Sequence, residues 1–255
     1  MRLAGWKLIL LSLTLCEMAG AQLATRDSRG VAILAQVLNK AGGSPAVANI
    51  NDFSATGTIA YYSDEVTEGT VTIKSRGLHQ FRIDASVNGG QRTSVVSATA
   101  AFQKSEDGST LTLPSQNTIK VASCTFPLLQ VLDATQDTTV EVSYGGIITH
   151  NGQEVHDILV QRTFHNDPLK ALSTFSKAHI FVDPQMLTVQ AVEDTTFAMK
   201  GVGHFSHEMQ FADYRTVDGV LIPFSITEFI SGQKTMSIEL GQLRFNTGLS
   251  DSVFE

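Results

Sequence analysis

Between positions 53 and 245, apolar residues recur at every second position in short runs that turn signals separate. Ile59 and Tyr61 alternate with small or polar neighbours, and the same spacing returns after Val140. Such alternation gives a β-strand one apolar face and one polar face. Asn151-Gly152 separates two of these runs, and Asn-Gly favours a two-residue hairpin because both turn positions need a positive φ. The pattern therefore predicts a meander of antiparallel strands.

The number of strands determines the shape of this sheet. The runs and turn signals indicate about ten or eleven strands. A single sheet of that width curls into a barrel or half-barrel, because twist accumulates from strand to strand. Gly241 interrupts the last run and predicts a β-bulge there. No linker or composition shift divides the chain after residue 21, so we expect one mainly β domain of the α+β class over residues 22–255.

The clearest helix is predicted over residues 28–41. Its apolar residues follow the i, i+3, i+4, i+7 spacing of one helix face, namely Val31, Leu34, Ala35, Leu38 and Ala41. Asp27 or Ser28 can cap the start of this helix, and Gly42-Gly43 ends it. The helix precedes all of the predicted strands.

Three other segments depart from the simple alternation. Residues 127–134 and 168–177 are predicted to form short helices, the second with Leu169 and Leu172 facing inward. Residues 103–120 are polar and contain turn residues, so we expect a weak hairpin or a loop there. None of these segments divides the β domain.

The first residues of the chain are typical of a secretion signal. Arg2 and Lys7 supply its positive start, and the apolar run that follows is only about eight residues long, whereas a membrane-spanning helix needs roughly 20. Ala19-Gly20-Ala21 offers the small residues that signal peptidase needs, so cleavage is expected before Gln22. The sequence therefore predicts a signal peptide over residues 1–21 and a periplasmic or secreted mature chain.

Cys16 leaves a second interpretation of this segment open. A lipoprotein signal places a small residue just before a cysteine that becomes lipidated, but here Leu15 holds that position. We therefore favour cleavage and keep a lipid-anchored product as the alternative. Cleavage leaves Cys124 as the one cysteine, which we interpret as a buried apolar residue rather than a nucleophile. No later segment is apolar enough to span a membrane.

The charge of the chain narrows the classes of partner. The net charge is −7, and the lysines and arginines are scattered along the sequence. Nucleic acids are bound by clustered positive charge, so we do not expect a nucleic acid partner. Asp213 and Arg215 are interpreted as an ion pair at the edge of the sheet.

No pattern in the sequence predicts catalysis, a metal or a cofactor. Ser231 and Lys234 match the S-x-x-K motif, but on a hairpin turn their side chains do not share a helix face. His204 and His207 are three residues apart on a strand and point to opposite faces, so we interpret them as structural or exposed. We expect no cluster of polar side chains inside the barrel and predict that the protein is not an enzyme.

Apolar residues on the last three paired strands fall on one common face. This stripe, which we call the apolar stripe, consists of Phe205, Met209, Phe211, Ile222, Phe224, Ile226, Met236, Ile238 and Leu240. It is either an ordinary packed core or the lining of a cavity for an acyl chain or another apolar ligand. Met and Phe suit a ligand cavity because they adapt their shape.

Three segments carry a resemblance to a known family. The helix that ends at Gly42-Gly43 is followed by Phe53-Ser54-Ala55-Thr56-Gly57-Thr58-Ile59 at the start of the meander. Ile180-Phe181-Val182 and Leu187-Thr188-Val189 flank an Asp183-Pro184 step. The segment 211–224 reads as a hairpin with Asp213-Tyr214-Arg215 before Asp218-Gly219. With these segments the chain resembles the LolA-like superfamily of periplasmic lipoprotein carriers and outer-membrane lipoprotein-sorting proteins.

The resemblance implies an incomplete barrel whose open side is covered by short helices and whose apolar cavity takes lipid. On this basis we expect a periplasmic binding or carrier protein for a lipid or a lipidated protein, with the apolar stripe in the cavity. The alternative is a non-enzymatic envelope module with a filled core that acts structurally or as a sensor through contacts with a protein partner. Neither hypothesis requires a cofactor.

Overall fold

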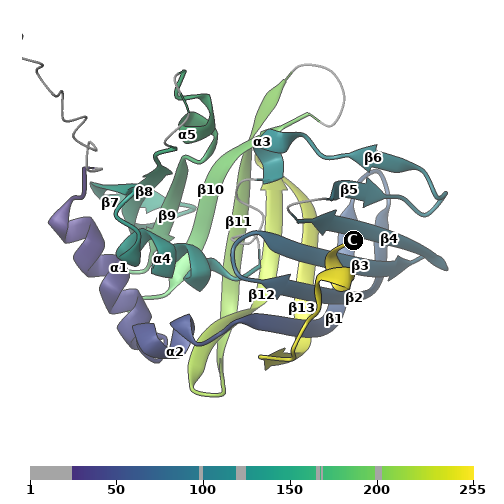
Figure 1. Ribbon diagram of the computed structural model, residues 1–255, viewed down its shortest axis with the longest axis horizontal. Helices are drawn as coiled ribbons and strands as arrows, with labels where there is room; N and C mark the ends of the chain where they lie inside the picture. The colour runs from purple at the N-terminus through teal and green to yellow at the C-terminus, as the bar shows by residue number, and fades with distance from the viewer. Residues whose placement is uncertain (1–24, 98–99, 119–124, 165–166, 168, 199–202) are drawn as a thin grey trace, which may run out of the picture.

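The computed structural model describes residues 25–97, 100–118, 125–164, 167, 169–198 and 203–255 (Figure 1). The strands are β1 Asp52–Tyr62, β2 Val66–Arg76, β3 Gln80–Val87, β4 Gly90–Val96, β5 Ala101–Lys104, β6 Thr110–Thr112, β7 Val140–His150, β8 Gln153–Arg162, β9 Ala178–Val182, β10 Val189–Phe197, β11 His204–Val217, β12 Val220–Ile230 and β13 Gln233–Phe245. The helices are α1 Ser28–Lys40, α2 Ser44–Ala48, α3 Ser115–Thr118, α4 Pro127–Gln136, α5 Ala171–Phe175 and the 3₁₀ turn η2 Asp251–Phe254.

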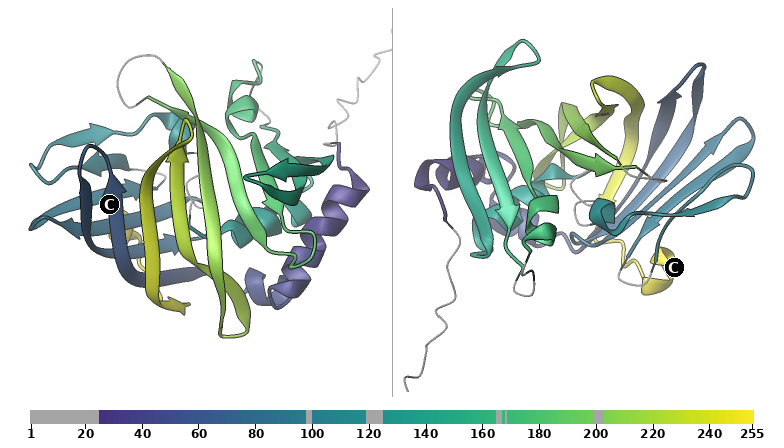
Figure 2. Two further views of the ribbon diagram at one scale, coloured as in Figure 1. Left: turned by 180° about the vertical axis from the view of Figure 1, so that it is seen from behind. Right: turned by 90° about the horizontal axis from the view of Figure 1, so that it is seen from above.

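The thirteen strands found among the described residues belong to one antiparallel sheet, in the order β6-β5-β4-β3-β2-β1-β13-β12-β11-β10-β9-β8-β7. The chain enters at the centre with β1, builds out to β6 at one edge, crosses to β7 at the other edge and returns inward to β13. The sheet is strongly curved, but β6 and β7 do not pair with each other (Figure 2). The predicted incomplete barrel is therefore confirmed.

The strand number exceeds the predicted ten or eleven because of β4, β5 and β6. These strands are short and rich in polar residues, so they show little apolar alternation. Their existence depends on pairing, since β4 pairs with β3 and β5 pairs with both β4 and β6. The weak hairpin expected over residues 103–120 is formed by β5 and β6, and α3 follows it.

The predicted bulge at Gly241 is present in the β1–β13 pair, where the two halves of the sheet meet. Thr56 on β1 faces Gln242 on β13, whereas Gly57 faces Leu240, so Gly241 is the extra residue. At this point the two backbones approach closely, because a Cβ on Gly57 would lie 2.1 Å from the Glu239 carbonyl oxygen. The bulge bends the sheet where the outgoing and returning meanders meet.

Helix α1 forms where it was predicted and packs across one end of the concave face (Figure 1). The Asp27 carboxylate caps it by accepting hydrogen bonds from the backbone N–H groups of Arg29 and Gly30, at 2.9 and 3.0 Å. Its apolar side is buried in the core together with that of α4. At its C-terminus, the Ala41 carbonyl accepts a hydrogen bond from the Leu221 N–H, which ties α1 to β12.

Arg26 joins the segment before α1 to the edge of the sheet. The backbone N–H of Asp27 donates to the carbonyl of Val142 on β7, and Arg26 forms a parallel bridge with Val142. The Arg26 guanidinium also donates four hydrogen bonds to carbonyl oxygens at and beyond the C-terminal end of α4. A cation at a helix C-terminus is favourable because unpaired carbonyls gather there.

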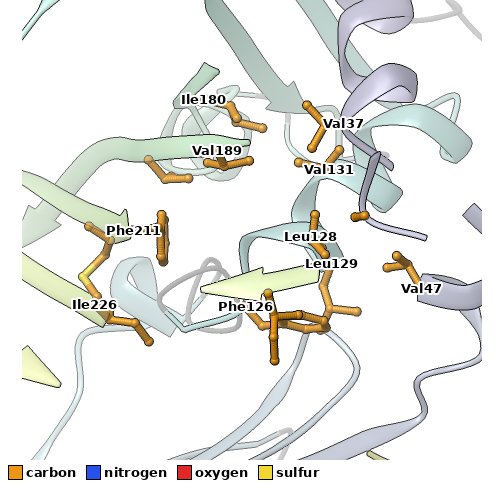
Figure 3. Close-up of a cluster of buried hydrophobic side chains, with 14 of the residues drawn as sticks. Val37, Val47, Phe126, Leu128, Leu129, Val131, Ile180, Val189, Phe211 and Ile226 are labelled. Atoms are coloured by element: carbon orange, nitrogen blue, oxygen red, sulfur yellow. The ribbon is translucent and has the colours of Figure 1, made fainter. Parts of the chain in front are cut away.

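The core fills the concave side between the helices α1 and α4 and the inner face of strands β1 to β3 and β7 to β13. The cross-strand row Phe211, Ile226 and Ile238 runs through it, because these residues are direct partners on β11, β12 and β13. Figure 3 shows Phe211 and Ile226 facing α4 residues such as Leu128. The sheet therefore needs the helices to bury its inner face at this end.

Two predictions about local structure have clear outcomes. The Asn151-Gly152 hairpin is confirmed, with φ of 49° and 79° at the two turn residues. The inward orientation of Leu169 and Leu172 is wrong, because their exposed fractions are 87% and 41%. The helix there, α5, has only about one turn and lies against β8 and α3.

The signal peptide, its cleavage point before Gln22, Cys16 and Cys124 lie outside the described residues. Among the residues that the structure describes, no helix combines the length and the apolar character needed to cross a membrane.

Candidate functional site

A cavity of about 490 Å³ lies inside the curve of the sheet. Its walls come from the outgoing strands β1, β3, β4 and β5, from α3 and from the returning strands β10 to β13. Most of the lining surface is apolar, and the apolar side chains are Tyr61, Phe81, Ile83, Val96, Leu113, Phe197, Ala198, Phe205, Met209, Ile230, Met236 and Ile238. The volume falls within the range of about 300–1,000 Å³ that small-molecule sites occupy.

The structure divides the apolar stripe into two parts. Four of its members line the cavity: Phe205, Met209, Met236 and Ile238. The remaining five do not line the cavity and belong to the packed core, in which Met209 and Ile238 also take part: Phe211, Ile222, Phe224, Ile226 and Leu240. The division follows position along the strands, because the helices cover the core part of the stripe and leave the other end open.

Phe205 marks the mouth of the cavity and Met209 its inner end. Phe205 is 44% exposed, whereas Met209 is only 2% exposed. Both side chains are on β11 and point to the same face, since they are separated by an even number of residues. The apolar stripe therefore extends from the exposed Phe205 to the buried Met209.

A group of charged side chains interrupts this apolar wall. His207 on β11 forms an ion pair with Asp194 on β10 and another with Glu228 on β12. Its Nδ1 lies 2.9 Å from the Asp194 carboxylate, and its Nε2 lies 3.3 Å from the Glu228 carboxylate. The second oxygen of Glu228 accepts a hydrogen bond from the Thr235 hydroxyl at 2.6 Å. His207, Asp194 and Glu228 all line the cavity, and we call them the buried charged triad.

The triad holds His207 in its charged form. Burial alone would lower the pKa of His207, but the hydrogen bonds and negative charges of Asp194 and Glu228 outweigh it and raise that pKa to about 9. His207 in turn lowers the pKa of Glu228 against the effect of burial. Both ring nitrogens of an imidazolium are donors, so His207 has no lone pair with which to accept a proton.

The expectation of no polar cluster inside the barrel is therefore wrong. The sequence did contain a signal for this polar cluster. His207 is an even number of residues from Met209 and Phe211 on its strand, and Glu228 is an even number of residues from Ile226. Polar residues at these positions must face the same side as the apolar stripe. The direct pairing of Asp194 with His207 depends on the strand register, which only the fold provides.

The fold of this sheet has counterparts among solved structures, whereas no protein-family model and no curated protein matches the sequence. An outer membrane lipoprotein-sorting protein domain from Vibrio parahaemolyticus aligns over 89% of this chain and 96% of its own, with a TM-score of 0.52 and 15% identity. A LolA superfamily protein from Nitrosomonas europaea aligns over 87% and 97%, with a TM-score of 0.51 and 11% identity. The chain has the LolA-like fold.

A third solved structure with this fold is a DUF1329 family protein from Desulfovibrio piger, which aligns over 91% of this chain and 98% of its own with a TM-score of 0.54 and 11% identity. The three alignments cover 87–91% of this chain and 96–98% of the other chains, so the likeness extends over most of the fold. At this level of identity the likeness concerns the fold.

Other polar residues considered from the sequence lie away from the cavity. Asp213 and Arg215 form an exposed ion pair, in the part of β11 that extends beyond its pairing with β10, as expected of a locally exposed edge. Lys234 lies against Tyr62, with Nζ 2.9 Å from the Tyr62 hydroxyl, and Ser231 is in the β12–β13 turn. Ser231 and Lys234 therefore do not form a helical S-x-x-K pair.

Proposed function

We propose that this protein is an exported binding or carrier protein for the acyl chain of a lipid or of a lipidated protein. The observation that carries this proposal is the cavity of about 490 Å³, which continues the apolar stripe from an exposed Phe205 to a buried Met209. An acyl chain in this space would be removed from water at about 0.8 kcal/mol for each buried methylene. About ten methylenes would contribute roughly 8 kcal/mol before the cost of immobilising the ligand is subtracted.

The predicted signal peptide and the LolA-like fold support the same proposal from independent directions. An exported chain works outside the cytoplasm, where lipids must be shielded from water during transfer. The solved structures with this fold include a lipoprotein-sorting domain. The periplasm is the compartment that agrees with both observations.

The buried charged triad also favours binding over catalysis. A histidine acts as a general base only in its neutral form, but His207 is held as an imidazolium between two carboxylates. One imidazolium beside two carboxylates leaves the triad with a net negative charge in the cavity wall. Its role would be to orient the polar end of a ligand whose chain lies against Met209 and Ile238.

The test is uptake of a dansyl-labelled undecanoic acid by the mature chain after delipidation. Phe205→Glu places a charge at the mouth of the cavity and should weaken uptake at least tenfold. Met186→Glu is the matched control, because Met186 is 59% exposed, does not line the cavity and receives the same charge. Equal uptake by the two variants would contradict the proposal.

Native mass spectrometry identifies the source of the natural acyl chain. A mass increase that organic solvent removes indicates a lipid, and a co-purified acylated polypeptide indicates a lipidated protein. If the chain binds no probe and carries no acyl group, but retains a protein partner after delipidation, the alternative of an envelope module acting through protein contacts is correct.

A further inference from the structure

The outer face of the sheet holds two carboxylates that oppose each other. Glu193 on β10 and Glu208 on β11 are direct cross-strand partners, and so are their neighbours Asp194 and His207. Because side chains alternate between faces, the Asp194–His207 pair faces the cavity and the Glu193–Glu208 pair faces outward. We call these cross-strand pairs the inner rung and the outer rung. The inner rung pairs opposite charges, whereas the outer rung pairs like charges, which destabilise a sheet when they are directly opposite.

The β7–β8 hairpin brings an imidazole to the outer rung. His150 is the last residue of β7, and its ring stacks on Phe181 with a centroid separation of 3.9 Å. Its Nε2 lies 3.0 Å from a Glu208 carboxylate oxygen, and the side chains of His150 and Glu208 are only 17% and 13% exposed. The stacking on the buried Phe181 fixes the plane in which this nitrogen points.

Two amide side chains hold the Glu208 carboxylate in position. Its Oε1 accepts hydrogen bonds from Asn151 Nδ2 at 2.8 Å and from Gln210 Nε2 at 2.6 Å. These bonds occupy one oxygen and direct the other, Oε2, toward His150. Hydrogen-bonded partners of this kind orient the ligands of metal sites.

We propose that His150, Glu193 and Glu208 form a binding site for a divalent transition metal, with Zn²⁺ as the reference ion. One potential ligand atom from each residue lies within 4.8 Å of the others. Ligands about 2.1 Å from a tetrahedral Zn²⁺ are roughly 3.4 Å apart, so modest side-chain rotations bring all three atoms to one ion. One imidazole nitrogen with two carboxylate oxygens suits Zn²⁺ better than Mg²⁺ or Ca²⁺, which prefer oxygen ligands alone.

The ion would reduce the repulsion between Glu193 and Glu208 and connect strands β7, β10 and β11. A dication balances the charges of Glu193 and Glu208, and the imidazole binds it in the neutral form. Because His150 is at the tip of the β7–β8 hairpin, the metal would fasten this hairpin to the outside of β10 and β11. The fastened region lies directly behind the cavity wall that carries Asp194 and His207. The site does not depend on the proposed ligand, and its test is separate from the uptake experiment.

Isothermal titration of the EDTA-treated mature chain with ZnCl₂ tests the site. The expected result is binding of one ion per chain, with an affinity at least tenfold weaker in His150→Gln and in Glu193→Gln. His204→Gln is the control, because His204 is an exposed histidine on β11 outside the group. Absence of binding, or the same affinity in all four proteins, would overturn the proposal.

Thermal unfolding distinguishes a metal site from a simple His150–Glu208 ion pair. Without metal, Glu193→Gln should melt at the same temperature as the unsubstituted chain or higher, since it removes the like charge opposite Glu208. With ZnCl₂, the melting temperature of the unsubstituted chain should rise and that of Glu193→Gln should not. An equal rise in both proteins would refute the assignment of Glu193 as a ligand.

Discussion

Stability above neutral pH should depend on His207. Burial opposes the charged form of this imidazole, but Asp194 and Glu228 overcome that effect and raise its pKa from 6.5 to about 9. Each pKa unit corresponds to about 1.4 kcal/mol, so protonated His207 stabilises the folded chain by about 3 kcal/mol. Because the folded pKa is the higher one, this contribution is complete below pH 6.5 and disappears as the pH rises through 9.

The assay is urea unfolding followed by circular dichroism between pH 6 and pH 10. Tryptophan fluorescence does not serve, since the chain has one tryptophan, Trp6, and it belongs to the predicted signal peptide. Relative to the unsubstituted chain, His207→Gln should lose about 3 kcal/mol near pH 6, and the difference should shrink above pH 9. His204→Gln controls for the loss of an exposed histidine on the same strand.

A direct measurement covers the case in which His207→Gln does not fold. The imidazole resonances of His207 in the unsubstituted chain report its titration by nuclear magnetic resonance. A midpoint near 9 supports the reasoning, and a midpoint near 6.5 refutes it. A difference in stability between the chain and His207→Gln that does not change between pH 6 and pH 10 would refute it as well.

Further substitutions test the fold around the site. Ile226→Ala should cost about 3 kcal/mol in urea unfolding, because the side chain is fully buried and leaves a cavity. Arg26→Ala should cost about 2 kcal/mol, since it removes hydrogen bonds to four carbonyl oxygens. Gly42→Ala should cost about 3 kcal/mol or more, because φ is 114° and the new Cβ would lie 2.3 Å from the Gly219 carbonyl oxygen. N-terminal sequencing of the exported chain should begin at Gln22, and a start at Cys16 would indicate the lipid anchor.

Local structure was predictable where a single segment determines it. The face of α1, its cap at Asp27 and the hairpin at Asn151-Gly152 follow from residue spacing and backbone preference alone. The bulge at Gly241 was predictable for the same reason. Strands β4 to β6 were less visible, because a short polar strand is stable only through its neighbours.

The candidate site was predictable in its composition but not in its geometry. The apolar stripe was identified from alternation, but only the helices decide that Ile226 is in the core and Met209 lines a cavity. His207 and Glu228 are polar exceptions on that face, but the alternation alone does not indicate that their side chains meet. The alternation describes one strand at a time and does not show which residues of neighbouring strands or helices pack against it.

By itself, the sequence of this protein indicated the predicted export signal, the antiparallel meander and the buried face of the strands that alternate clearly. The tertiary structure decided which residues on different strands meet. His150 and Glu208 are 58 positions apart in the chain and 3.0 Å apart in the fold. The register of β10 on β11 alone places Asp194 beside His207 in the cavity and Glu193 beside Glu208 on the outer face. The physical reason is that the face to which each side chain of a strand points depends on the local sequence alone. Strand register and sheet curvature depend instead on contacts summed over the whole sheet.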